Sequence, residues 1–137
     1  MASFNKFNSF VDALSKKVHN LGSDVLKVML TNSAPVATNS QKSNLTDITA
    51  GNGYTAGGTA TTPTLSNSSG TEKLVCTDVV FTATGAVGPF RYAVLYNDTA
   101  TNKELIGWWD YGSSISLANG ETFTVDFDGT NGVLTLA

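Results

Sequence analysis

The sequence predicts a mainly β protein, an antiparallel β-sandwich or barrel of six to eight strands with one N-terminal amphipathic helix. The main observation is that, from Lys73 to Ala137, short apolar or alternating runs are separated by Gly, Asn and Asp turns. A second is the helical period of the first twenty residues. With 137 residues in all, we expect a single domain over 1–137, with a helix or arm over 1–22 and a β-domain over 23–137.

Apolar residues near the N-terminus recur at three- and four-residue steps, which places them on one stripe of a helix. The members of this stripe are Phe4, Phe7, Phe10, Val11, Leu14, Val18 and Leu21. The pattern predicts a helix from about Phe4 to Asn20, capped by Ser3 or Asn5 and ended by Gly22. Three phenylalanines exceed what a short helix needs for its own stability, so the stripe must pack on a sheet of the same chain or on another subunit.

The segment after the helix alternates between strand and loop signals. Val25 to Thr31 reads as a first strand with one apolar face. Asn32 to Asn44 turns polar around Pro35, which predicts a loop long enough to be functional in a compact domain. Ala56 to Gly70 is rich in Thr, Ser, Gly and Asn, and fits either an edge strand or a projecting loop.

Later strands are better defined. Phe90 to Tyr96 carries apolar residues on both sides, which predicts a central strand. Ile106 to Tyr111 has two usable faces, so its adjacent tryptophans, Trp108 and Trp109, are expected to point in opposite directions. Thr122 to Phe127 has the alternation of a half-buried strand. The Asp128-Gly129 and Asn131-Gly132 pairs predict a closing hairpin into Val133 to Leu136.

Composition excludes several classes of partner. Charged residues make up 14% of the chain, well below the roughly 25% of typical soluble domains, and Ser, Thr, Asn and Gly take their place. The net charge of −3 and the absence of a basic cluster argue against nucleic acid. No apolar run is long enough to span a membrane and no signal peptide is recognisable, so we expect synthesis in a cytoplasm.

Residues able to perform acid–base, nucleophilic or metal chemistry are sparse, so we expect neither an enzyme nor a cofactor. His19 is the only histidine, and a surface or capping role is expected for it. Cys76 lies in an apolar run and is expected to be a buried thiol. Asp126, Asp128 and Asn131 have a spacing faintly like a calcium loop, but the distal glutamate is missing and a turn is the better interpretation.

Aromatic residues offer one alternative function. Trp108, Trp109 and Tyr111 could form a platform on which sugar rings stack, as in a carbohydrate-binding β-module. Because the two tryptophans are expected on opposite faces, packing in the core or at a subunit interface is the preferred interpretation. Catalytic, metal-binding and cofactor-binding residues are not predicted.

Several stretches resemble small structural proteins of tailed bacteriophages. These stretches are Phe7 to Val11, Val18 to Leu21, Leu26 to Asn32 with Ala34-Pro35, Gly51 to Gly58, Gly88 to Tyr92 and Ile106 to Gly112. Within that group, the size and predicted architecture are most similar to capsid decoration (cement) proteins. The resemblance implies a non-enzymatic component on the capsid surface of the virion that binds and stabilises the major capsid protein lattice.

For such a role we expect a homo-oligomer, a dimer or a trimer, that makes many weak contacts on a repeated surface. A tail or head-to-tail component is the alternative within the virion. The candidate partner-binding residues are Phe4, Phe7, Phe10, Pro35, Trp108 and Trp109.

Overall fold

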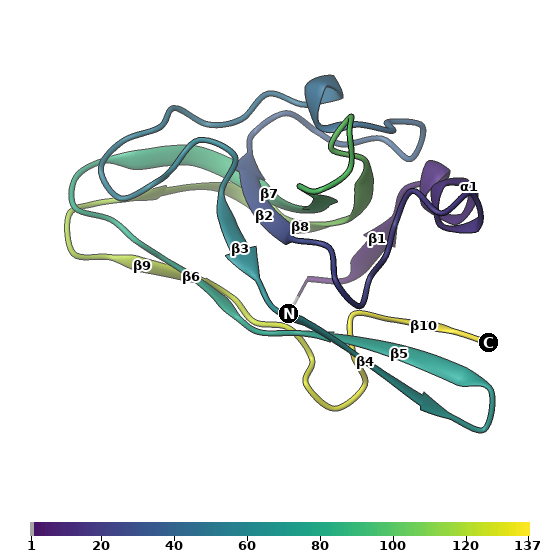
Figure 1. Ribbon diagram of the computed structural model, residues 1–137. Coiled ribbons are helices and arrows are strands. Elements are labelled where there is room, and N and C mark those ends of the chain that lie inside the picture. Colours follow the sequence, from purple (N-terminus) through teal and green to yellow (C-terminus); the bar gives the residue numbers. More distant parts are fainter. Residues whose placement is uncertain (1) are drawn as a thin grey trace.

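The structure is a computed structural model that describes residues 2–137 (Figure 1). Its elements in chain order are β1 (Phe4–Lys6), α1 (Ser9–Ser15), β2 (Leu26–Thr31), a 3-10 helix (Lys42–Asn44), β3 (Thr59–Thr61), β4 (Pro63–Ser68), β5 (Thr71–Cys76), β6 (Val79–Thr82), β7 (Val87–Asn97), β8 (Leu105–Leu117), β9 (Thr122–Val125) and β10 (Leu134–Leu136). The prediction of a mainly β, antiparallel fold with one α-helix is confirmed. The described residues form ten strands where six to eight were expected, because short edge strands and breaks add to the count.

A five-stranded antiparallel sheet forms the first layer, in the order β1-β8-β7-β2-β3. The long strands β7 and β8 are its centre, joined by a loop over 98–104. Three register shifts interrupt their pairing, and such irregularities let long strands bend. The prediction that Phe90 to Tyr96 is a central strand is confirmed, since β7 has neighbours on both sides.

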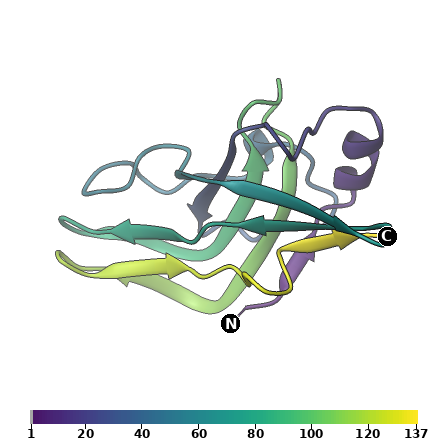
Figure 2. The ribbon, with the colours of Figure 1, turned by 60° about the horizontal axis from the view of Figure 1, so that its bottom comes forward.

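The second layer is built from segments that continue out of the first (Figure 2). β6 pairs with β9, and β5 pairs with both β10 and β4. The prediction of a closing hairpin between Thr122 to Phe127 and Val133 to Leu136 is therefore wrong. Residues 126–133 instead form a wide loop, in which Gly132 N donates to Asp128 O at 2.9 Å. β9, which precedes this loop, pairs with β6, and β10, which follows it, pairs with β5.

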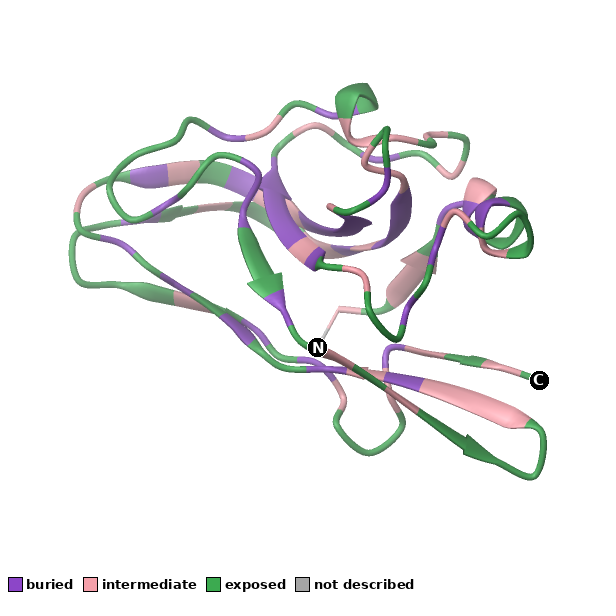
Figure 3. Cartoon of the chain, viewed as in Figure 1, coloured by how far each residue is buried: buried purple, intermediate pink, exposed green. Residues whose placement is uncertain are grey.

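The main core lies between these layers. It includes fully buried side chains from both, among them Phe90, Ile106 and Leu74. Figure 3 shows the buried residues concentrated on β2, β7 and β8, while much of β3 and β4 is exposed. Complete burial of a large apolar side chain contributes about 1.5–3 kcal/mol, so this interface holds the layers together.

The predicted N-terminal helix is shorter than expected and displaced. Phe4 belongs to β1, which pairs with β8 in the register Phe4↔Trp109. The helix spans only Ser9–Ser15, with Asn8 as N-cap, and Lys17 takes the left-handed conformation (φ 64°) that Gly22 was expected to adopt. Residues 2–22 thus include a strand of the main sheet, because pairing with β8 outweighs a marginal first helical turn.

A second apolar cluster, which we call the outer cluster, lies on the opposite face of the main sheet. Its members are Phe7, Met29, Leu45, Val94, Tyr96 and Leu105, with Trp108 packed against them. The segment over 32–48 crosses this face and is tied to it by backbone hydrogen bonds, from Leu105 N to Ser40 O at 3.0 Å and from Asn8 N to Ala37 O at 2.9 Å. Both faces of β2 are therefore covered, which explains why five of its six residues are buried.

The Thr- and Ser-rich region over 56–70 forms two edge strands, which decides between the two interpretations of it. β3 is the edge of the five-stranded sheet, and β4 is the edge of the three-stranded sheet. The β4–β5 hairpin, together with β10, extends beyond the rest of the chain as an arm (Figure 1). We refer to the sheet formed by β4, β5 and β10 as the β-arm.

Candidate functional site

The structure separates the six residues that the sequence suggested as partner contacts. Phe7, Phe10 and Trp109 are 0%, 1% and 5% exposed, and Pro35 is also buried. Only Phe4 and Trp108 are partly accessible. The predicted aromatic stripe does not form one surface, because Phe7 packs in the outer cluster while Phe10 lies in the main core.

The sheet also separates the two tryptophans, as alternation along β8 predicted. Trp109 packs into the main core, and Trp108 packs on Phe7 in the outer cluster with 4.5 Å between ring centroids. Tyr111 makes an edge-to-face contact with Phe123 at 5.0 Å. Because Trp108 and Trp109 lie on opposite faces of the main sheet, Trp108, Trp109 and Tyr111 do not combine into one flat exposed platform for sugars.

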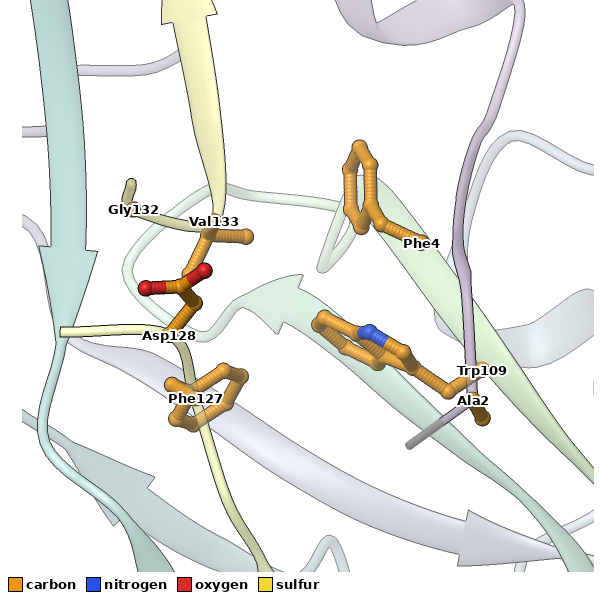
Figure 4. Close-up of a pocket in the computed structure, with 7 residues that line it drawn as sticks. All are labelled: Ala2, Phe4, Trp109, Phe127, Asp128, Gly132 and Val133. Carbon is orange, nitrogen blue, oxygen red and sulfur yellow. The ribbon is translucent and has the colours of Figure 1, made fainter. Parts of the chain in front are cut away.

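A hollow of about 160 Å³ lies beside β1 and β8, where the wide loop over 126–133 approaches them. It is lined by Ala2, Phe4, Trp109, Phe127, Asp128, Gly132 and Val133 (Figure 4). We call this hollow the aromatic pocket. Three of its rings form a continuous series, because Trp109 lies 5.4 Å from Phe4 and 5.4 Å from Phe127. The planes of Phe4 and Trp109 are tilted by 55°, and Trp109 and Phe127 meet edge to face at 69°.

Asp128 lines the aromatic pocket on the side opposite Phe4 and Trp109 (Figure 4). Its Oδ1 accepts hydrogen bonds from the backbone N–H groups of Thr130 and Asn131, and its Oδ2 accepts one from the Asn131 side chain. These donors hold the pKa of Asp128 below its ordinary value. Among residues 2–137, Asp128 has no ion-pair partner within 4.0 Å. Its expected role as a turn residue agrees with this geometry.

His19 was expected at the surface or as a cap, but it is buried, because the helix ends before it and the chain turns inward. It is 4% exposed and packs against Phe10 at 5.3 Å between ring centroids. Its Nδ1 lies 3.0 Å from the amide nitrogen of Asn97, which also donates to Asp24. Since Asn97 supplies a proton, Nδ1 acts as the acceptor. Burial lowers the pKa of His19, and the charges of Glu104 and Asp24 oppose this effect.

A second polar network fixes the chain segment over 47–58 against the main sheet. Tyr54 donates to Asp47 at 2.5 Å, and Asp47 also accepts from the backbone of Gly57 at 2.6 Å. Tyr96 donates to the carbonyl of Gly57 at 2.6 Å. Burial is the main cause that raises the pKa of both tyrosines. All these groups are used in hydrogen bonds that hold backbone, which is a structural role.

The β-arm presents an open strand edge. Thr62 and Thr77 continue the pairing of β4 with β5 by one residue, and Thr77 N donates to Thr62 O at 3.1 Å. This bond shows that the backbone of Thr62 points toward β5. Since alternate residues of an antiparallel strand point their backbone groups to opposite sides, those of Leu65 and Asn67 face away from β5. No other strand within residues 2–137 pairs with this edge. The six residues of β4 include no charged side chain, and the sequence signal for this edge was the Thr- and Ser-rich composition.

A metal site, a reactive thiol and a membrane span each place requirements on the described residues. Within residues 2–137, no three His, Cys, Asp or Glu side chains are placed to hold a metal ion. Cys76 is buried, as predicted, and burial raises its pKa to about 11. None of the helices formed by residues 2–137 has the length and apolar character needed to cross a bilayer.

Comparisons of the chain with protein-family models, with curated proteins and with solved structures found no match. The function is therefore argued from the β-arm, the aromatic pocket and the sequence itself.

Proposed function

We propose that this chain is a non-enzymatic virion structural protein of a tailed bacteriophage that decorates and stabilises the capsid by binding the major capsid protein lattice. The observation that carries the proposal is the open edge of the β-arm. It projects from a well-packed β-scaffold and offers unpaired backbone groups along an uncharged strand. The resemblance of the sequence to small phage structural proteins supports the same assignment.

An open edge of this kind suits assembly. Exposed strand edges are usually protected by charges, bulges or proline, since an extended segment of another chain can pair with them. β4 has Pro63 only at its start, and its pairing with β5 runs without a register shift from Pro63 to Ser68. A neighbouring capsid subunit, or a second copy in a dimer or trimer, can add a strand there. On a lattice, many such modest contacts add through avidity.

The low charge of the chain fits this proposal. Backbone pairing at β4 requires two strands to approach to about 4.8 Å, and like charges on the edge would oppose that approach. Thr64 and Ser66 present small hydroxyl side chains that are exposed. A tail or head-to-tail position would use the same edge, so location must be measured. The carbohydrate-binding alternative has no comparable support, because Trp108 and Trp109 lie on opposite faces of the main sheet and do not form one platform.

The test compares capsid binding by matched variants. The double variant Thr64→Glu and Ser66→Glu places charges on β4 at exposed positions, where Ser66 faces Lys73 in the pairing with β5. We expect it to fold normally and to lose most of its cosedimentation with empty capsids of the encoding phage. Thr101→Glu, an exposed change in the β7–β8 loop, is the control and should bind like the parent.

Location and effect on stability complete the test. Antibodies against the protein should label the capsid surface of purified virions, and particles that lack the protein should break at lower temperature. Labelling of the tail would replace the decoration role with a tail role. Absence from virions would reject the virion assignment altogether, and unchanged binding of the β4 variant would reject the edge as the contact.

A further inference from the structure

We propose that the aromatic pocket is a binding site for an alkylammonium group, such as the end of a lysine side chain or a choline headgroup. This inference does not rest on a role in the virion. It rests on the juxtaposition of three aromatic rings and one carboxylate around a hollow of about 160 Å³.

The first argument is the chemistry of the lining. An aromatic ring has a negative face, which attracts a cation within about 6 Å of its centroid. Three rings line the hollow, with Trp109 in the middle, and its ring centroid lies 5.4 Å from those of Phe4 and Phe127. Methyl or methylene groups beside the charge would also cover the apolar side chain of Val133. A small inorganic cation would gain nothing from that apolar contact.

The second argument is the negative charge of Asp128. Asp128 is only partly exposed, and its three hydrogen bonds come from neutral groups of Thr130 and Asn131. The charge of Lys73 acts on Asp128 from a distance and helps to lower its pKa, but Lys73 Nζ donates to the carbonyl oxygen of Thr130 at 2.9 Å instead of pairing with the carboxylate. Within residues 2–137 the carboxylate of Asp128 is in no ion pair, so a cation bound at the pocket would meet its charge without first breaking one.

The third argument is the rigidity of the site. Trp109 is fixed by β8 and is 5% exposed, Phe127 is 6% exposed, and Phe4 is held by its pairing with Trp109 in the register of β1. Two hydrogen bonds to Asp128 Oδ1 fix the carboxylate on its own turn. A preformed site loses little conformational entropy when it binds.

The experiment is an NMR titration of the full-length, 15N-labelled protein with choline and with n-butylammonium. The two indole N–H signals give an internal control, because Trp109 lines the pocket and Trp108 lies on the opposite face of the sheet. We expect saturable shifts of the Trp109 signal with a Kd of the order of millimolar, which is typical for a small ligand with few atoms. The neutral isostere 3,3-dimethylbutanol should bind choline's site at least about fivefold more weakly, because it lacks the cation–π and carboxylate attraction.

Two variants distinguish the contribution of the Asp128 charge to cation binding from that of the shape of the aromatic pocket. Asp128→Asn keeps an oxygen that accepts from Thr130 and Asn131 but removes the negative charge, and should weaken cation binding by about five- to tenfold. Asp126→Asn, a change at an exposed neighbour that does not line the pocket, should leave the affinity unchanged. Preference for choline would indicate a quaternary headgroup as the natural ligand, and preference for n-butylammonium would indicate a lysine side chain.

The proposal fails if neither cation shifts the Trp109 signal in a saturable way up to about 100 mM, a limit set by the millimolar affinity expected. It also fails if 3,3-dimethylbutanol binds as tightly as choline, since the hollow would then be merely apolar. This comparison uses the unmodified protein, so it decides the question even if Asp128→Asn fails to fold. A negative result here leaves the proposed β4 contact untouched.

Discussion

Gly107 on β8 provides a direct test of the finding that the N-terminal residues form a strand. In the observed register it lies opposite Lys6, and the ring of Phe4 covers it. A Cβ atom at this position would lie 2.1 Å from Phe4 Cε2 and 2.8 Å from the carbonyl oxygen of Asn5. Contacts under 3.0 Å force something to move. Gly107→Ala should therefore displace β1 or the Phe4 ring.

Overpacking of this kind costs typically about 1–3 kcal/mol. For a chain of 137 residues, an unfolding entropy of about 2.1 cal/mol/K per residue gives about 0.29 kcal/mol/K in total. A cost of about 2 kcal/mol then lowers the Tm by about 7 °C. Chemical denaturation monitored by tryptophan fluorescence measures the free energy of unfolding directly. Gly129→Ala is the matched control, because its added Cβ meets nothing within 4 Å.

A double-mutant cycle makes the test specific to Phe4. On a Phe4→Ala background the ring clash disappears, so Gly107→Ala should cost about 1 kcal/mol less than in the parent, with the Asn5 carbonyl contact left in place. If Gly107→Ala is neutral, or costs the same with and without the Phe4 ring, β1 does not pair with β8 as described. A helix over Phe4 to Asn20 would then become the better interpretation.

Two further predictions concern buried titratable groups. Burial lowers the pKa of His19 below its ordinary value of 6.5, so the unfolded chain binds the proton more readily. The free energy of unfolding should then fall as the pH drops below about 6.5 and level off below the folded-state pKa, and His19→Gln should flatten this part of the pH profile; an unchanged profile would contradict the burial. The pKa of Cys76 is raised to about 11, so the folded protein should react with a thiol reagent at pH 8 only as fast as it opens. Rapid labelling without denaturant would contradict this expectation.

The sequence was sufficient where a pattern maps directly onto the environment of a strand. Apolar residues on both sides of Phe90 to Tyr96 indicated a central strand, and β7 is one. Period-two alternation separated Trp108 from Trp109, and the structure places them in different clusters. The buried state of Cys76 also followed from its apolar neighbours. Each of these conclusions needs only local residues and the geometry of one strand.

The same reasoning failed at the N-terminus because a helical period is not unique over a few turns. Phe4, Phe7 and Phe10 are three residues apart, but strand pairing at Phe4 and a turn at Asn8 send them to different places. The prediction that His19 is exposed was wrong for the same reason, since it depended on a helix that in fact ends at Ser15. No local signal distinguishes the two outcomes, because the decisive contact is with Trp109, about a hundred residues away in the chain.

The sequence by itself determined the fold class, the positions of most strands and the small number of residues able to perform acid–base, nucleophilic or metal chemistry. Composition and period-two alternation are enough for these conclusions, because neither requires contacts between distant parts of the chain. Which strands pair was decided only in the tertiary structure. Thr122–Val125 and Leu134–Leu136 each pair with part of the segment over 71–82 instead of with each other. The aromatic pocket exists for the same reason, since it joins Phe4, Trp109 and Asp128 from distant parts of the chain. Long-range pairing depends on the fit of whole layers around a shared core, and no short window of sequence contains that information.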